Sequence, residues 1–159
     1  MRAPRRWAGT TGPIPALLVA ALVFGCGAGG PRAQEAAPVH IQAILAMQVE
    51  GACTTALGFV VESGPDKSAN YKKVVDKLRA QFPRARSNFQ KDNFKKQKHM
   101  GRHMVVVSAG TGKPGCTGRA MGIGFGKDAT EARKDAEEAL GKIWPFAGGA
   151  MKVEHSKAY

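Results

Sequence analysis

The sequence predicts an α+β fold in which duplicated ββα units form a four-stranded, mostly antiparallel sheet with two helices on one face. Three observations lead to this prediction. Apolar residues at helical spacing indicate two amphipathic helices, at about 68–82 and 129–143. Strand-like segments precede each helix. The signals that flank the two helices recur at one offset along the chain.

The offset is 62 residues. It relates pairs that flank or face the two predicted helices: Gly64 and Gly126, Asp66 and Asp128, Leu78 and Leu140, Phe82 and Trp144, and Pro83 and Pro145. Each helix therefore follows a Gly-x-Asp segment and ends before a proline, which cannot continue a helix. Any two amphipathic helices share their core spacing. Turn, cap and stop signals that agree at one offset favour an internal duplication.

Two strand-like segments come before each helix. They are residues 39–49 and 54–61 in the first half, and 103–108 and 119–125 in the second. The first segment is also compatible with a helix. In the last segment glycines alternate with bulky apolar residues, so one face of the strand is nearly bare backbone. We expect a helix to pack on that face, and close approach of a partner or ligand is the alternative.

The first 26 residues have the order of an export signal. Arginines at 2, 5 and 6 precede an apolar core at 14–24, and small Gly25 precedes Cys26. That core is shorter than the roughly 20 residues of a membrane-spanning helix. Its end resembles a bacterial lipoprotein signal, in which such a cysteine becomes lipidated. We expect export and lipidation of Cys26, and an ordinary signal peptide cut nearby is the alternative.

The domain boundaries follow from these segments. We expect a signal peptide at 1–25, a flexible tether at 26–38, a single domain at 39–145 and a C-terminal tail at 146–159. The repeat halves are 39–83 and 103–145, and the basic segment 84–102 reads as the connection between them. The protein would then reside in the cell envelope, facing the periplasm or the outer surface, or be secreted.

Two cysteines remain once Cys26 is lipidated or removed. Cys53 and Cys116 occupy nearly equivalent places in the two halves. Because exported proteins fold where thiols oxidise, we expect a disulfide between them, and two buried free thiols are the alternative. Neither a cofactor nor a metal is expected. His99 and His103 are four residues apart, but Gly101 lies between them and no third ligand is near.

Positive charge is concentrated between residues 67 and 102. Twelve lysines and arginines there oppose only two aspartates, so this stretch carries a net +10 of the chain's +12. Clustered cations with interleaved phenylalanines suit polyanions. The predicted anion-binding residues are Arg84, Arg86, Lys91, Lys95, Lys96, Lys98 and Arg102. A solvated basic loop that only keeps the protein soluble is the alternative.

Outside the cytoplasm, the matching partners are anionic lipid, lipopolysaccharide and acidic polysaccharide. We do not expect nucleic acid as a partner, because the second predicted helix begins with Asp128 and carries more acids than bases. Any contact with a membrane is expected through a lipid anchor only.

No catalytic residue can be assigned from the sequence. The serines lack a GxSxG elbow, and the glycine-rich segment 110–114 lacks the spacing of a phosphate-binding loop. We expect a non-catalytic binding or structural role in the envelope, with contact to anionic surfaces through the basic segment. A small secreted enzyme or enzyme inhibitor is the alternative.

The strand around Gly122-Ile-Gly124-Phe and the helix from Glu131 to Leu140 carry a family resemblance. Together they resemble small exported bacterial domains of unknown function that are built from two strand–strand–helix units. The resemblance spans much of the mature chain. It implies an exported α+β domain and adds no catalytic residues.

Overall fold

The computed structural model describes residues 38–95 and 98–159. These residues form β1 (His40–Glu50), β2 (Cys53–Gly64), α1 (Lys67–Gln81), β3 (Ser87–Asp92), β4 (Phe94–Lys95), β5 (Lys98–His99), β6 (His103–Gly110), β7 (Arg119–Gly126), α2 (Ala129–Ile143) and β8 (Gly148–Ala158). The predicted signal peptide, the predicted lipidation site Cys26 and all of the predicted tether except Pro38 lie outside the described residues.

The strands form three antiparallel sheets, and the predicted single four-stranded sheet with both helices on one face is wrong. The first sheet has the order β2-β1-β3 and the second has the order β7-β6-β8, while β4 and β5 form a short hairpin. Each half has a strand after its helix that the sequence does not predict. β3 lies within the predicted connection 84–102, and β8 lies within the predicted C-terminal tail 146–159. With three strands of its own, each half completes a separate sheet.

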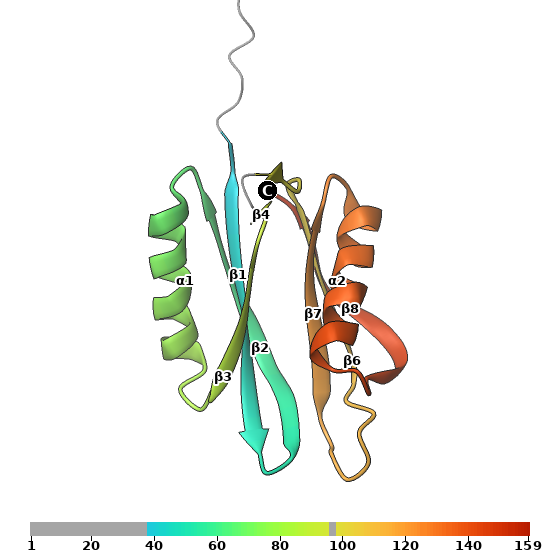
Figure 1. Cartoon of the computed structure of the whole chain (residues 1–159). Helices are drawn as coiled ribbons and strands as arrows, with labels where there is room; N and C mark the ends of the chain where they lie inside the picture. The colour runs from blue at the N-terminus through green and yellow to red at the C-terminus, as the bar shows by residue number, and fades with distance from the viewer. Residues whose placement is uncertain (1–37, 96–97) are drawn as a thin grey trace, which may run out of the picture. The chain divides into compact units, whose positions relative to one another are not determined.

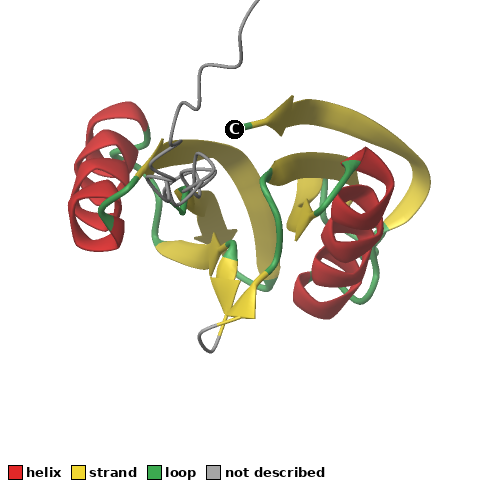
Figure 2. Ribbon diagram, turned by 90° about the horizontal axis from the view of Figure 1, so that it is seen from above, coloured by secondary structure: helices red, strands yellow, loops and turns green. Residues whose placement is uncertain are grey.

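The two sheets pack face to face, and each helix covers the outer face of its own sheet (Figures 1 and 2). Ile41 and Leu45 of β1 share one buried cluster with Val106 of β6 and Ile123 and Phe125 of β7. A second cluster lies between α1 and the first sheet and contains Ile44, Ala46, Val60, Val74 and Leu78. The layers are therefore α1, first sheet, second sheet and α2.

Both helices have the ends that the sequence predicts. Asp66 and Asp128 are the N-caps, and each side chain accepts hydrogen bonds from two backbone N–H groups of the first turn. At the other end the backbone N–H of Phe82 or Trp144 donates to the carbonyl four residues earlier. The same element order and the same strand order thus occur in both halves.

The bare face of β7 is the surface on which α2 lies, which confirms the helix-packing expectation. A Cβ atom added at Gly122 would lie 2.1 Å from the carbonyl oxygen of Ala136, and one at Gly124 would lie 2.1 Å from that of Ala132. Such distances leave no room for a side chain. The alternating glycines therefore set the short separation between α2 and the second sheet.

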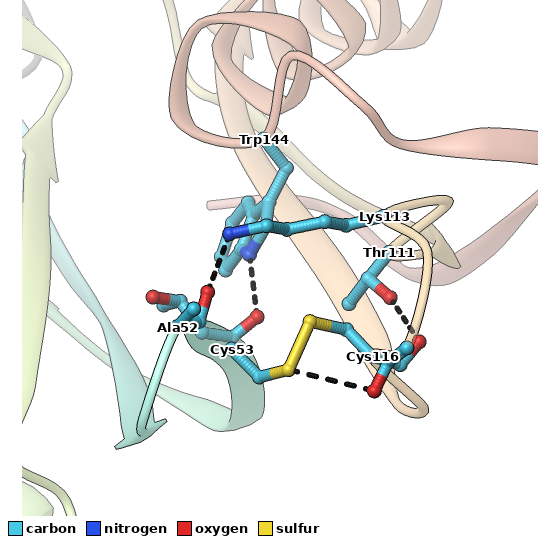
Figure 3. Close-up of a disulfide and its surroundings, with 8 residues drawn as sticks. Ala52, Cys53, Thr111, Lys113, Cys116 and Trp144 are labelled. Atoms are coloured by element: carbon cyan, nitrogen blue, oxygen red, sulfur yellow. Dashed lines mark hydrogen bonds between the residues drawn. A yellow bond between two sulfur atoms is a disulfide. The ribbon is translucent and has the colours of Figure 1, made fainter.

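The predicted disulfide between Cys53 and Cys116 is confirmed, with Cα atoms 5.5 Å apart. It joins the start of β2 to the loop between β6 and β7 (Figure 3). Two further contacts cross between the halves beside it. Trp144 donates its indole N–H to the carbonyl of Thr54 at 3.1 Å, and the Lys113 ammonium donates to the carbonyl of Ala52 at 2.6 Å. The halves are thus fastened at this end by one covalent bond and two hydrogen bonds.

Candidate anion-binding surface

The residues predicted to bind anions separate into groups along β3. Arg84 and Arg86 precede the strand, whereas Lys95, Lys98 and Arg102 follow it. Lys96 lies outside the described residues. Lys91 lies within β3 itself, and its side chain already has a partner, Asp135.

Lys91 belongs to the contact between the two halves. Its ammonium lies 2.6 Å from Oδ2 of Asp135 on α2, and the same oxygen accepts a hydrogen bond from the backbone N–H of Phe125 at 2.8 Å. The two side chains are only 17% and 24% exposed. Burial lowers the pKa of Lys91, and its hydrogen bond to Asp135 opposes that shift. We therefore exclude Lys91 from the anion-binding surface.

Asn93 fastens the β4–β5 hairpin beside the start of β1. Its side chain is fully buried and makes three hydrogen bonds to the backbone. Oδ1 accepts from the N–H of Ile41 at 2.8 Å, and Nδ2 donates to the carbonyls of Val39 at 2.9 Å and Gly101 at 3.0 Å. His99 on β5 also places Nε2 3.0 Å from the carbonyl oxygen of Val39. The hairpin is thereby held where the chain enters the domain.

The exposed cations of this hairpin lie together. Lys95 and Lys98 are directly paired in the β4–β5 register, and no carboxylate among the described residues forms an ion pair with either. The C-terminus reaches the same end of the domain (Figure 1), where Tyr159 donates its backbone N–H to the carbonyl of Arg102. The Lys157 ammonium lies 4.6 Å from the centre of the Tyr159 ring. We call Lys95, Lys98, Arg102 and Lys157 the basic end.

A groove runs between α1 and β3 on the outer face of the first sheet. It consists of two hollows of about 510 and 270 Å³, which share Tyr71 and Gln90. A third hollow of about 480 Å³ lies at the edge of β3 beside the hairpin and is lined by Phe89, Lys91 and Met100, which face the second half. The sequence contained no direct signal for this groove, because it depends on where α1 lies on the sheet.

One histidine–serine contact among the described residues resembles part of a catalytic arrangement. His103 Nε2 lies 3.0 Å from the hydroxyl of Ser156, but no described carboxylate contacts the other imidazole nitrogen to orient the ring. Within residues 38–95 and 98–159, no group of three potential ligands could hold a metal ion. The hollow beside the disulfide is small, at about 170 Å³, and Trp144 and Phe146 line it.

Neither described helix has both the length and the apolar character needed to cross a bilayer. No protein-family model, curated protein or solved structure matches the chain.

Proposed function

We propose that the protein is an exported, lipid-anchored envelope protein with a non-catalytic role, and that its basic end contacts the anionic head groups of the membrane that holds the anchor. One observation supports the proposal above all others. Asn93 bonds to both Val39 and Gly101, so the hairpin that carries Lys95 and Lys98 lies where the segment after Cys26 enters the domain.

The length of that segment would keep the basic end within reach of an anchor. Thirteen positions separate Cys26 from Val39, and a chain with the composition of the predicted tether would have a root-mean-square span of about 20 Å. The intervening residues are mostly glycine, alanine and proline. A lipid on Cys26 would therefore hold the domain close to the membrane surface, with the entry point nearest to it. This span exceeds the roughly 8 Å over which the surface potential decays at physiological salt, so the tether permits the contact and the cations feel the potential only when the basic end approaches the surface.

The basic end would also add electrostatic attraction to the lipid anchor. It would hold one end of the domain against anionic head groups, whereas the lipid alone fixes only the point of attachment. Each lysine or arginine close to an anionic membrane contributes about 1 kcal/mol. Lys95 and Lys98 together would therefore contribute about 2 kcal/mol, or roughly 30-fold in affinity.

Vesicle binding tests the contribution of the hairpin. The chain from residue 27 onward, which lacks Cys26 and any lipid on it, is mixed with vesicles of phosphatidylcholine and phosphatidylglycerol, and bound protein is measured by flotation at several salt concentrations. The Lys95→Gln/Lys98→Gln variant should bind about 30-fold more weakly and lose part of its salt dependence. The control is Lys134→Gln/Lys142→Gln, which removes the same charge from exposed positions on α2. Equal losses in both variants would show that net charge alone drives binding.

Intact-mass analysis of the membrane fraction tests the anchor separately. We expect a mature chain that begins at a lipidated Cys26. An unlipidated mature chain beginning at Gly29 or later would contradict the anchor and leave simple secretion. Because this result is independent of vesicle binding, the two parts of the proposal can fail separately.

A further inference from the structure

The α1–β3 groove exists because α1 covers β1 and β2 and leaves the outer face of β3 open. Val74 and Leu78 of α1 pack on Ile44, Ala46 and Val60, which belong to β1 and β2. On β3, Asn88 and Gln90 remain exposed, and both line the groove. β3 is six residues long, so the groove beside it extends for about 20 Å.

The second half has a corresponding hollow between α2 and β8 that differs from the α1–β3 groove in size and charge. At the offset of 62, Val60 of β2 corresponds to Gly122 of β7, so α1 rests on a side chain where α2 rests on bare backbone. The hollow between α2 and β8 is smaller, at about 380 Å³. Its one cation, Arg133, is paired with Glu137 at 2.8 Å. Size and available charge therefore distinguish the first half from its duplicate.

The α1–β3 groove presents several kinds of polar and apolar group. Tyr71 on the helix wall is 45% exposed and lines both hollows of the groove. Asn88 and Gln90 supply neutral amides, which both donate and accept hydrogen bonds. Arg79 and Arg86 line one end, and neither has a carboxylate partner among the described residues. The groove thus combines an aromatic face, amides and available cations.

We infer that the α1–β3 groove binds an acidic polysaccharide that contains uronic acids. The amides of Asn88 and Gln90 match sugar hydroxyls, which also donate and accept. The Tyr71 ring provides an apolar surface for the face of a sugar ring. The guanidinium groups of Arg79 and Arg86 match carboxylates, to which arginine can donate two parallel hydrogen bonds.

Charge and shape favour this occupant over the chain's own N-terminal segment and over a lipid surface. Residues 27–37 contain one arginine and one glutamate, so they carry no net charge to complement the groove. A flat membrane would meet protruding cations, whereas Asn88 and Gln90 flank a concave channel. An extended polymer can lie along it. An acidic peptide would use the arginines but has no particular need for Tyr71 and the amides together.

Calorimetric titration of the mature protein with oligogalacturonate tests the inference. Binding should be at least about tenfold tighter than for a neutral oligosaccharide of equal length, because that ligand leaves the arginines unpaired. Arg79→Gln/Arg86→Gln and Tyr71→Ala should each weaken binding at least about tenfold. Lys134→Gln/Lys142→Gln and Met151→Ala are the controls for charge and for exposed apolar area, and neither should change it.

Two results would overturn the inference. The first is equal binding of the acidic and neutral oligosaccharides. The second is that oligogalacturonate and polyglutamate of equal length bind equally tightly and that Tyr71→Ala weakens the binding of neither. That result would indicate that the groove binds an acidic peptide or any polyanion. Thermal unfolding of each variant shows whether a loss of binding comes from misfolding, and both Tyr71 and Arg79 are exposed enough to be replaced.

Discussion

Replacement of Gly124 by alanine should destabilise the protein because α2 lies directly on that residue. The added Cβ would lie 2.1 Å from the carbonyl oxygen of Ala132 and 2.2 Å from the backbone nitrogen of Ala136. Both are backbone atoms of α2, so no side-chain rotation relieves the clash. The helix must move away from β7 and lose packing along its length. Overpacking of this kind typically costs about 1–3 kcal/mol.

Gly141 provides a matched control in the same helix. It is exposed, and an added Cβ would have no atom within 4 Å. Alanine is a better helix former than glycine by about 1 kcal/mol, so Gly141→Ala should stabilise the protein. The same substitution therefore has opposite signs at the two positions, and the free energies of unfolding should differ by about 2–4 kcal/mol.

Urea denaturation and scanning calorimetry measure this difference. An unfolding entropy of about 0.25 kcal/mol/K for roughly 120 ordered residues converts it into about 8–16 °C between the two melting temperatures. An unfolding midpoint for Gly124→Ala equal to or above that of the parent would refute the close packing of α2 on β7. A Gly141→Ala variant that loses stability would instead show that the helix-propensity argument fails at that position.

Two further substitutions test the contacts between the halves. The Cys53→Ala/Cys116→Ala variant should lose about 4 kcal/mol, because the bond closes a loop with a sequence separation of 63 residues; chemical denaturation measures the loss, and a value below about 1 kcal/mol would contradict a constraining role. Lys91→Ala should cost about 1–3 kcal/mol, because it leaves Asp135 without its cation in a partly buried site. Lys95→Ala should change the free energy of unfolding by less than about 0.5 kcal/mol, and equal effects at the two lysines would contradict the assignment of Lys91.

The helices were predictable because their signals are local. Asp66 and Asp128 cap the first turns through side-chain hydrogen bonds to nearby backbone, and prolines follow the last turns. The disulfide was also predictable, because the repeat placed Cys53 and Cys116 at equivalent turns. Each of these inferences needs only short-range sequence information or the offset between the halves.

The sheet arrangement was not predictable from the same information. β3 and β8 are edge strands in which no residue is fully buried, and Phe89 is the one apolar residue of β3, so they lack the apolar alternation that reveals a half-buried strand. Without β3 and β8, the sequence predicts two strands in each half, and these four strands are compatible with a single sheet. The strands of the two halves could either pair edge to edge in one sheet or form two sheets that pack face to face. Which arrangement forms depends on contacts between the halves, and these are not visible in local sequence patterns.

The candidate site was only partly visible in the sequence for a similar reason. The cation cluster is a local feature, but the burial of Lys91 depends on Asp135, 44 residues away. Asn93 lies within a polar, basic run and looks solvent-exposed, yet its side chain is fully buried. The groove depends on how far α1 stands from its sheet, which side chains such as Val60 determine. The sequence shows how many cations the basic segment carries, but it does not show which of them lie on the surface and which are paired between the halves.

Hydrogen–deuterium exchange of the mature protein, free and bound to phosphatidylglycerol-containing vesicles, tests the proposed membrane contact most directly. The amides of β4, β5 and the last residues of β8 should exchange more slowly on vesicles, because they form the basic end. Residues 111–118, in the loop that carries Cys116 at the disulfide end, should exchange at the same rate in both states. Protection at the disulfide end, or none at the β4–β5 hairpin, would contradict the proposed orientation.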